Sequence, residues 1–94
     1  MDKQLNILVL DDDPIIRNLL RSMLKEKTNV MVAEKPSSAF DILKKEAVDV
    51  LISDFVMPEM NGLEVLARVK EEHPDVEVIM ISSEGNMDTV IGAL

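Results

Sequence analysis

Residues 50–62 read Val-Leu-Ile-Ser-Asp-Phe-Val-Met-Pro-Glu-Met-Asn-Gly, an apolar run that ends on a carboxylate and passes at once into a turn. An apolar run of this length predicts a buried strand, and Pro58 with Asn61-Gly62 marks the turn after it. Asp54 is therefore expected at the carboxyl end of a strand, the edge at which open α/β sheets hold their ligands. The stretch predicts a functional carboxylate at that edge.

Four apolar runs alternate with segments of helical periodicity along the chain. Strands are predicted over residues 5–10, 30–33, 49–53 and 76–81. Helices are predicted to begin at Asp13-Pro14, at Ser37 or Ser38, at Asn61 and at Met87. Strands that alternate with helices form parallel βαβ units with right-handed crossovers. The sequence therefore predicts an α/β fold built on a doubly wound parallel sheet, in one domain that covers residues 1–94.

Each predicted helix has an apolar and a charged face, as expected for helices that cover a sheet. In the first helix Arg17 and Arg21 are assigned to the solvent side. In the third helix Leu63, Leu66 and Val69 are expected to face inward.

Composition narrows the classes of function. A net charge of −8 argues against a nucleic-acid-binding surface on this segment. The chain has no cysteine, which excludes a disulfide framework and a zinc-thiolate site. Residues 1–5 lack the apolar region of a signal peptide, and no apolar run approaches the length of a membrane span. These features predict a cytoplasmic protein that does not contact the membrane.

A second acidic cluster, Asp11-Asp12-Asp13, ends the first predicted strand. If this strand neighbours the one that ends at Asp54, the carboxylates converge and repel one another unless a cation lies between them. Oxygen ligands suit Mg²⁺, with a backbone carbonyl and water completing the site. The alternative is that the acids only favour a helix N-terminus, which explains Asp13 better than Asp11.

Ser82 and Ser83 follow the fourth predicted strand, so the same edge of the sheet should hold them. A hydroxyl there can donate a hydrogen bond to an oxyanion that a metal also binds. The alternative is that they are ordinary loop serines. Glu59 and His73 are interpreted as surface residues without a role in the site.

Three motifs of the chain closely resemble the receiver domains of two-component response regulators. They are Leu8-Val9-Leu10-Asp11-Asp12-Asp13-Pro14, Ser53-Asp54-Phe55-Val56-Met57-Pro58-Glu59-Met60-Asn61-Gly62 and Val78-Ile79-Met80-Ile81-Ser82-Ser83. The resemblance implies a phosphoacceptor at Asp54, an acidic pair for Mg²⁺ at Asp11 and Asp12, a metal-binding backbone carbonyl at Val56, and a phosphoryl-contacting switch residue at Ser82. Ser83 matches the small residue beside that switch.

The same resemblance implies a flavodoxin-like strand order of 2-1-3-4, and a regulatory domain rather than an enzyme. A histidine kinase or a phosphotransfer protein would supply the phosphoryl group, and an output domain is expected beyond Leu94. Receivers continue through a fifth strand, which carries a lysine, and a fifth helix; neither is present in this sequence. The domain is therefore expected to be incomplete, with an exposed sheet edge that favours a dimer.

Two alternatives belong to other functional classes. A metal-dependent phosphatase with a strand-end aspartate nucleophile needs a second carboxylate two residues later, where this chain has Val56. An interaction module with a receiver-like fold that is not phosphorylated stays open, because the usual lysine is missing.

Overall fold

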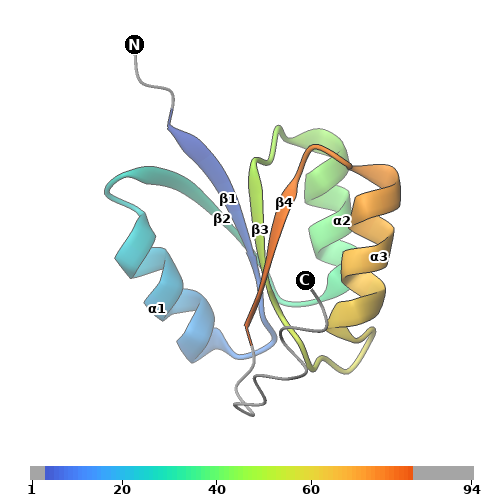
Figure 1. The fold of residues 1–94 in the computed structure, drawn as a ribbon. Helices are drawn as coiled ribbons and strands as arrows, with labels where there is room; N and C mark the ends of the chain where they lie inside the picture. Colours follow the sequence, from blue (N-terminus) through green and yellow to red (C-terminus); the bar gives the residue numbers. More distant parts are fainter. Residues whose placement is uncertain (1–3, 82–94) are drawn as a thin grey trace.

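The computed structural model describes residues 4–81, which form a sheet of four parallel strands in the order β2-β1-β3-β4 (Figure 1). The elements are β1 (Leu5–Leu10), α1 (Pro14–Leu24), β2 (Thr28–Ala33), α2 (Pro36–Lys45), β3 (Val50–Asp54), α3 (Gly62–Glu72) and β4 (Glu77–Ile81). The predicted α/β fold and strand order are confirmed. The helix predicted from Met87 lies outside the described residues.

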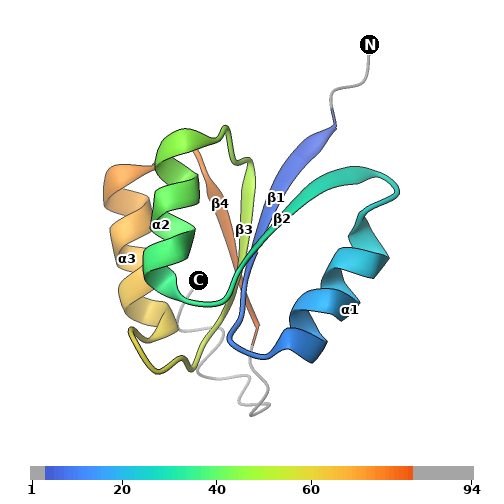
Figure 2. The ribbon, with the colours of Figure 1, turned by 180° about the vertical axis from the view of Figure 1, so that it is seen from behind.

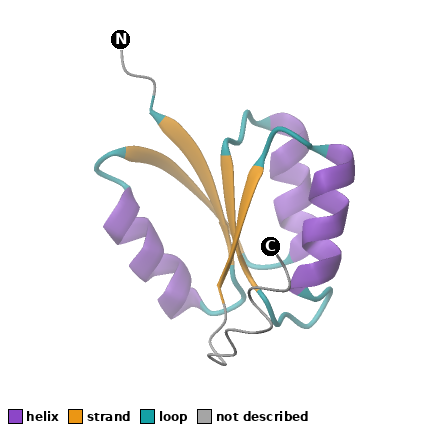
Figure 3. Cartoon of the chain, viewed as in Figure 1, coloured by secondary structure: helices purple, strands orange, loops and turns teal. Residues whose placement is uncertain are grey.

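Helices cover both faces of the sheet: α1 lies on one side, and α2 with α3 on the other (Figures 2 and 3). Alternate residues of a strand point to opposite faces, and β1 divides accordingly. Leu8 and Leu10 belong to the larger apolar cluster, which includes residues of α2 and α3. Ile7 and Val9 belong to a smaller cluster against which Leu20 of α1 packs. A strand that is apolar on both faces therefore occupies an interior position in the sheet.

The predicted start of α1 is confirmed. Asp13 is the N-cap residue, and its Oδ1 accepts a hydrogen bond from the backbone N–H of Ile15 at 2.9 Å. Pro14 takes the first helical position, where its fixed φ suits the helix and its missing N–H leaves no donor unpaired. This cap fixes the direction in which the chain leaves β1, and so the position of the acidic turn.

The predicted start of α2 at Ser37 or Ser38 is wrong, because the helix begins at Pro36. Lys35 is the N-cap residue and supplies no side-chain hydrogen bond. A carboxylate from another loop replaces the missing cap: Glu59 Oε1 accepts the backbone N–H of Ser37 at 2.8 Å.

The inward face of α3 is also partly different from the prediction. Leu63 is 46% exposed, whereas Val65 is completely buried. Gly62, Val65 and Val69 form the buried stripe, at spacings that place them on one side of the helix. Leu66 packs against the core from a partly buried position, as expected. The helix phase is set by the point at which it begins, next to the capping residue Asn61.

Gly62 allows α3 to begin directly against the carboxyl end of β3. A Cβ at this position would meet the Met80 side chain, and would lie 2.8 Å from Phe55 Cα and 3.0 Å from Asp54 O. The backbone N–H of Gly62 donates to Phe55 O at 2.7 Å. The loop over residues 55–61 therefore folds back tightly on the strand end.

β4 pairs with β3 from Val50↔Glu77 to Asp54↔Ile81. Within residues 4–81 it has no second strand neighbour, so its outer side is the sheet edge named in the sequence-based prediction.

Candidate functional site

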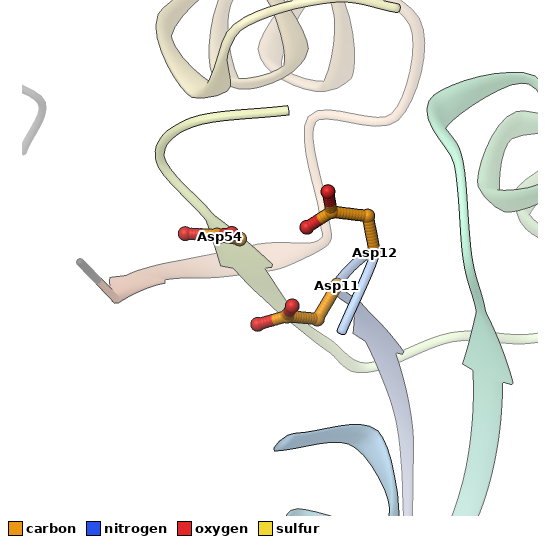
Figure 4. Close-up of side chains that lie close together, drawn as sticks. All are labelled: Asp11, Asp12 and Asp54. Atoms are coloured by element: carbon orange, nitrogen blue, oxygen red, sulfur yellow. The ribbon is translucent and has the colours of Figure 1, made fainter. Parts of the chain in front are cut away.

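Three carboxylates meet at the carboxyl end of the sheet. Asp11 and Asp12 follow β1, Asp54 ends β3, and Figure 4 shows the three side chains at these strand ends. One oxygen from each lies within 4.8 Å of the other two. The register explains the meeting: Leu10 is paired with Ser53, so the next residue on each strand is an aspartate. Two adjacent parallel strands thus bring together acids that lie more than forty residues apart in the chain.

Asp11 is only 3% exposed, and three hydrogen bonds hold it in place. Its backbone N–H donates to Ala33 O at 3.2 Å. Its side-chain Oδ1 accepts from the backbone N–H of Asp13 at 2.9 Å. Its backbone carbonyl accepts from Arg17 Nη1 at 2.8 Å. The Asp11 carboxylate consequently has a defined direction, whereas Asp12 is exposed at the mouth of the site.

Asp54 is 6% exposed, and its surroundings offer it few donors. The backbone N–H of Val56 lies 3.5 Å from Asp54 Oδ1, which is a long hydrogen bond. Ser53 Oγ donates to the backbone carbonyl of Asp54 at 3.1 Å and not to its carboxylate. The Asp54 carboxylate therefore keeps most of its acceptor capacity for a ligand.

Burial and mutual repulsion make the charged form of these acids unfavourable. The pKa of Asp54 is raised, first by burial and then by the negative charge of Asp11. The pKa of Asp11 is raised mainly by burial, with Asp12 and Asp13 adding repulsion; the hydrogen bond from Asp13 and the charge of Arg17 oppose the shift. A cation among the three carboxylates would relieve both effects.

The loop after β3 presents the remaining predicted site residue within the described part of the chain. Val56 lies in this loop with its side chain exposed. Because that side chain has no ligand atom, any contribution to a metal would come from the backbone carbonyl. Met57 is buried and anchors the loop to the core. Ser82 and Ser83 lie outside the described residues; Ile81, which precedes them, is paired with Asp54.

Glu59 is exposed, as expected of a surface residue, although it contacts the start of α2, whereas His73 differs from its interpretation as a surface residue. The Glu59 carboxylate accepts both the backbone N–H of Ser37 and, at 3.4 Å, its hydroxyl. His73 is half-buried, and its Nε2 is buried without a hydrogen-bond partner among the described residues. The assignment of Arg17 to the solvent side of α1 is likewise incomplete, because its guanidinium contacts Asp11. No local sequence signal marks the contact between Glu59 and Ser37, which joins separate segments.

A cavity of about 390 Å³ adjoins the carboxylates on the side of Asp12. It is lined by Asp12, Glu34, Lys35, Pro36, Pro58 and Glu59. The exposed carboxylate of Asp12 thus borders open space between the loops that follow β1, β2 and β3.

The family model of the response regulator receiver domain matches residues 7–94. The chain belongs to this family. Receiver domains are the phosphoacceptor signalling domains of two-component systems, and they act as regulatory domains. The functional class expected from the three motifs is therefore confirmed.

Receiver proteins of known sequence align with nearly the whole chain. A chemotaxis protein CheY homolog of Campylobacter jejuni is 40% identical over 95 residues, which cover 96% of this chain and 73% of that protein. The putative response regulator NtrX-like of Rickettsia typhi is 36% identical over 97% of this chain, but the match covers only 20% of that longer protein. Similar receivers thus occur both in short proteins and as one part of larger regulators.

Solved structures of related proteins have the same fold. NtrX from Brucella abortus superposes with a TM-score of 0.90 at 31% identity, over 97% of this chain and 21% of that one. The response regulator protein TrrA from Thermotoga maritima, solved in complex with Mg²⁺-BeF, gives a TM-score of 0.82 at 31% identity, over 96% of this chain and 81% of that one. In the described part of this receiver, no helix has the length and apolar character needed to cross a bilayer.

Proposed function

We propose that this receiver accepts a phosphoryl group on Asp54, with Mg²⁺ held by Asp11, Asp12, Asp54 and the backbone carbonyl of Val56. The observation that carries the proposal is the meeting of three carboxylate oxygens within 4.8 Å of one another. The proposal includes the cytoplasmic location expected from the sequence, and a histidine kinase or phosphotransfer protein as the donor. It also includes an output partner that responds to the phosphorylated state.

The donor set fits Mg²⁺ in both chemistry and spacing. Mg²⁺ prefers oxygen ligands at about 2.0–2.1 Å, so neighbouring ligands lie about 3 Å apart and opposite ligands about 4 Å apart. The three carboxylate oxygens lie within 4.8 Å of one another, so the side chains would have to close on the ion, and Asp12 is exposed enough to move. Water and the Val56 carbonyl would complete the octahedron. When bound, Mg²⁺ would neutralise charge that develops on the transferring phosphoryl group.

Asp54 has the properties of the nucleophile in this proposal. One of its carboxylate oxygens would attack phosphorus in the donor phosphohistidine, and the phosphorus–nitrogen bond would break with its electron pair left on the imidazole. The product is an acyl phosphate on Asp54. The open acceptor positions of Asp54 support this role, because the contact from Val56 N–H is long, at 3.5 Å, and Phe55 N–H donates to Ile81 O at 2.9 Å.

Ser82 is proposed to contact the new phosphoryl group and to act as the switch residue. The phosphoryl group carries almost two negative charges and several acceptor oxygens, so a nearby hydroxyl gains a strong hydrogen bond. The support for this role is the match of Val78-Ile79-Met80-Ile81-Ser82-Ser83 to the receiver motif and the pairing of Ile81 with Asp54.

The proposal is tested by phosphorylation with a small donor. The chain is treated with acetyl phosphate and Mg²⁺, and the modification is measured by intact mass and mapped to a peptide. We expect one phosphoryl group on Asp54, no product with EDTA, and no product in Asp54→Asn. Asp75→Asn, which makes the same change at an exposed residue before β4, should react normally. Undiminished product in Asp54→Asn would contradict the proposal and favour another acceptor. No product in the wild type would favour the interaction module that is not phosphorylated.

A further inference from the structure

Arg17 links helix α1 to the backbone of the carboxylate cluster. It lies in the first turns of α1 and is only half-exposed, and its Nη1 donates to the carbonyl oxygen of Asp11 at 2.8 Å. Its backbone N–H also donates to Asp13 O at 3.1 Å, within the helical ladder. The side chain therefore turns back over the β1–α1 turn instead of extending away from it.

The carbonyl that Arg17 contacts lies where regular strand pairing stops. The ladders that β1 forms with β2 and β3 both end at Leu10. Asp11 is the first residue beyond them, and it is almost fully buried. A buried carbonyl that loses a hydrogen bond without a replacement costs about 1–3 kcal/mol, so the Asp11 peptide would shift to regain a partner if Arg17 were removed. A shift of that peptide moves the Asp11 carboxylate.

The other two contacts of Asp11 do not fix this carbonyl. Ala33 O holds the backbone N–H, and Asp13 N–H holds the carboxylate oxygen Oδ1. Arg17 supplies the third hydrogen bond to Asp11, and it is the only one of the three whose partner group belongs to a side chain other than that of Asp11. Arg17 therefore adds a restraint on the Asp11 carbonyl that the other two contacts do not supply.

We propose that Arg17 is a positioning residue for the metal centre, which acts by holding the Asp11 backbone and without contacting the metal or the phosphoryl group. The inference rests on the proposed function, because it assumes that Asp11 is a metal ligand. The hydrogen bond from Arg17 is then expected to strengthen Mg²⁺ binding by more than the positive charge of Arg17 weakens it.

Geometry and charge predict opposite changes when Arg17 is neutralised. A positive charge beside a cation site repels Mg²⁺, so removal of the charge alone should tighten binding. Loss of the hydrogen bond should weaken binding, because groups that orient metal ligands are worth about 10- to 100-fold in affinity. The direction of the change therefore separates a positioning role from a purely electrostatic one.

Arg21 offers a matched control on the same helix. It is exposed, one turn further along α1, and its replacement removes the same charge. The test measures Mg²⁺ affinity by isothermal titration calorimetry for the wild type, R17M, R17K and R21M, with thermal melts in EDTA to establish folding. We expect about tenfold weaker Mg²⁺ binding in R17M. R21M should bind as tightly as the wild type, or slightly more tightly.

R17K keeps the charge but replaces the forked guanidinium by a single ammonium group. We expect its affinity to lie between those of R17M and the wild type. If R17M does not melt cooperatively, R17K decides alone, and an affinity equal to the wild type overturns the role of Arg17. The same role is overturned if R17M binds as tightly as R21M. A wild-type chain that binds no Mg²⁺ overturns the proposed function, and the role of Arg17 with it.

Discussion

The carboxylate of Glu59 caps the N-terminus of α2 by accepting the backbone N–H of Ser37 at 2.8 Å. This contact joins the loop after β3 to a helix that begins more than twenty residues earlier in the chain. It replaces a local cap, since Lys35 offers no side-chain acceptor. The negative charge also lies where the helix dipole favours it. The loop that presents Val56 is thereby tied to α2.

We predict that Glu59→Ala lowers the free energy of unfolding by about 1 kcal/mol, the usual value of an N-cap contact. Glu59→Gln keeps an acceptor oxygen but loses the charge, so it should lose less. Urea denaturation with a common slope measures both variants. Glu71→Ala, at an exposed position of α3, is the control and should change stability little. Equal stability of Glu59→Ala and the wild type would show that the contact contributes nothing in solution.

Mg²⁺ should stabilise the folded chain, because folding gathers Asp11, Asp12 and Asp54, which the unfolded chain separates. A site filled at 100 times its dissociation constant adds about 2.7 kcal/mol to the free energy of unfolding. Thermal melts across a Mg²⁺ series measure the gain, and Asp12→Ala should abolish most of it. The same variant should be at least as stable as the wild type in EDTA, because it relieves repulsion. A melting temperature that does not respond to millimolar Mg²⁺ counts against the site.

The position of each acid at a strand end was predictable from local sequence, whereas the strand order that brings the acids together came from the receiver resemblance. Asp11 and Asp54 each end an apolar run, and adjacent parallel strands bring their carboxyl ends to one edge. The start of α1 was equally predictable, because Asp13 and Pro14 are both strong and adjacent signals.

The differences arise where separate segments decide the outcome. The cap of α2 comes from Glu59, which no reading of residues 35–38 reveals. On α3, Gly62 lies against Phe55 at the start of the helix, with Val65 facing inward and Leu63 outward. The hydrogen bond from Arg17 depends on the end of strand pairing at Leu10. Periodicity shows that a helix is amphipathic, but the exact residues that it buries depend on where packing fixes it.

Gly62→Ala should destabilise the protein, although alanine is the better helix former. The added Cβ would lie 2.8 Å from Phe55 Cα and 3.0 Å from Asp54 O, and backbone atoms cannot move aside as a side chain can. Overpacking of this kind costs about 1–3 kcal/mol, which outweighs a gain in helix propensity of about 1 kcal/mol. The strain falls on the loop of Val56, so Mg²⁺ affinity should decrease as well. Leu63→Ala, at the next and exposed position, is the control for both measurements. A Gly62→Ala chain that is more stable than the wild type would show that the loop yields easily.

The raised pKa values of Asp11 and Asp54 predict how metal-free stability depends on pH. Between the ordinary carboxyl pKa and the raised values, the folded state binds more protons than the unfolded chain. The free energy of unfolding therefore falls as pH rises through this range, and the loss is complete above the raised pKa values. Below the ordinary carboxyl pKa both states are protonated, and these two groups cost nothing.

Asp54→Asn tests this dependence directly. The variant removes one buried charge and its repulsion of Asp11, while Asn Oδ1 can still accept the N–H of Val56. In EDTA we expect Asp54→Asn to be more stable than the wild type near neutral pH, with the difference shrinking as the pH is lowered through the carboxyl range. Asp75→Asn should follow the wild type throughout, because it leaves the cluster unchanged. Added Mg²⁺ should reverse the order near neutral pH, since the wild type alone keeps three carboxylates to bind it. A difference between Asp54→Asn and the wild type that stayed constant over the whole pH range would mean that buried charge at Asp54 is not its cause.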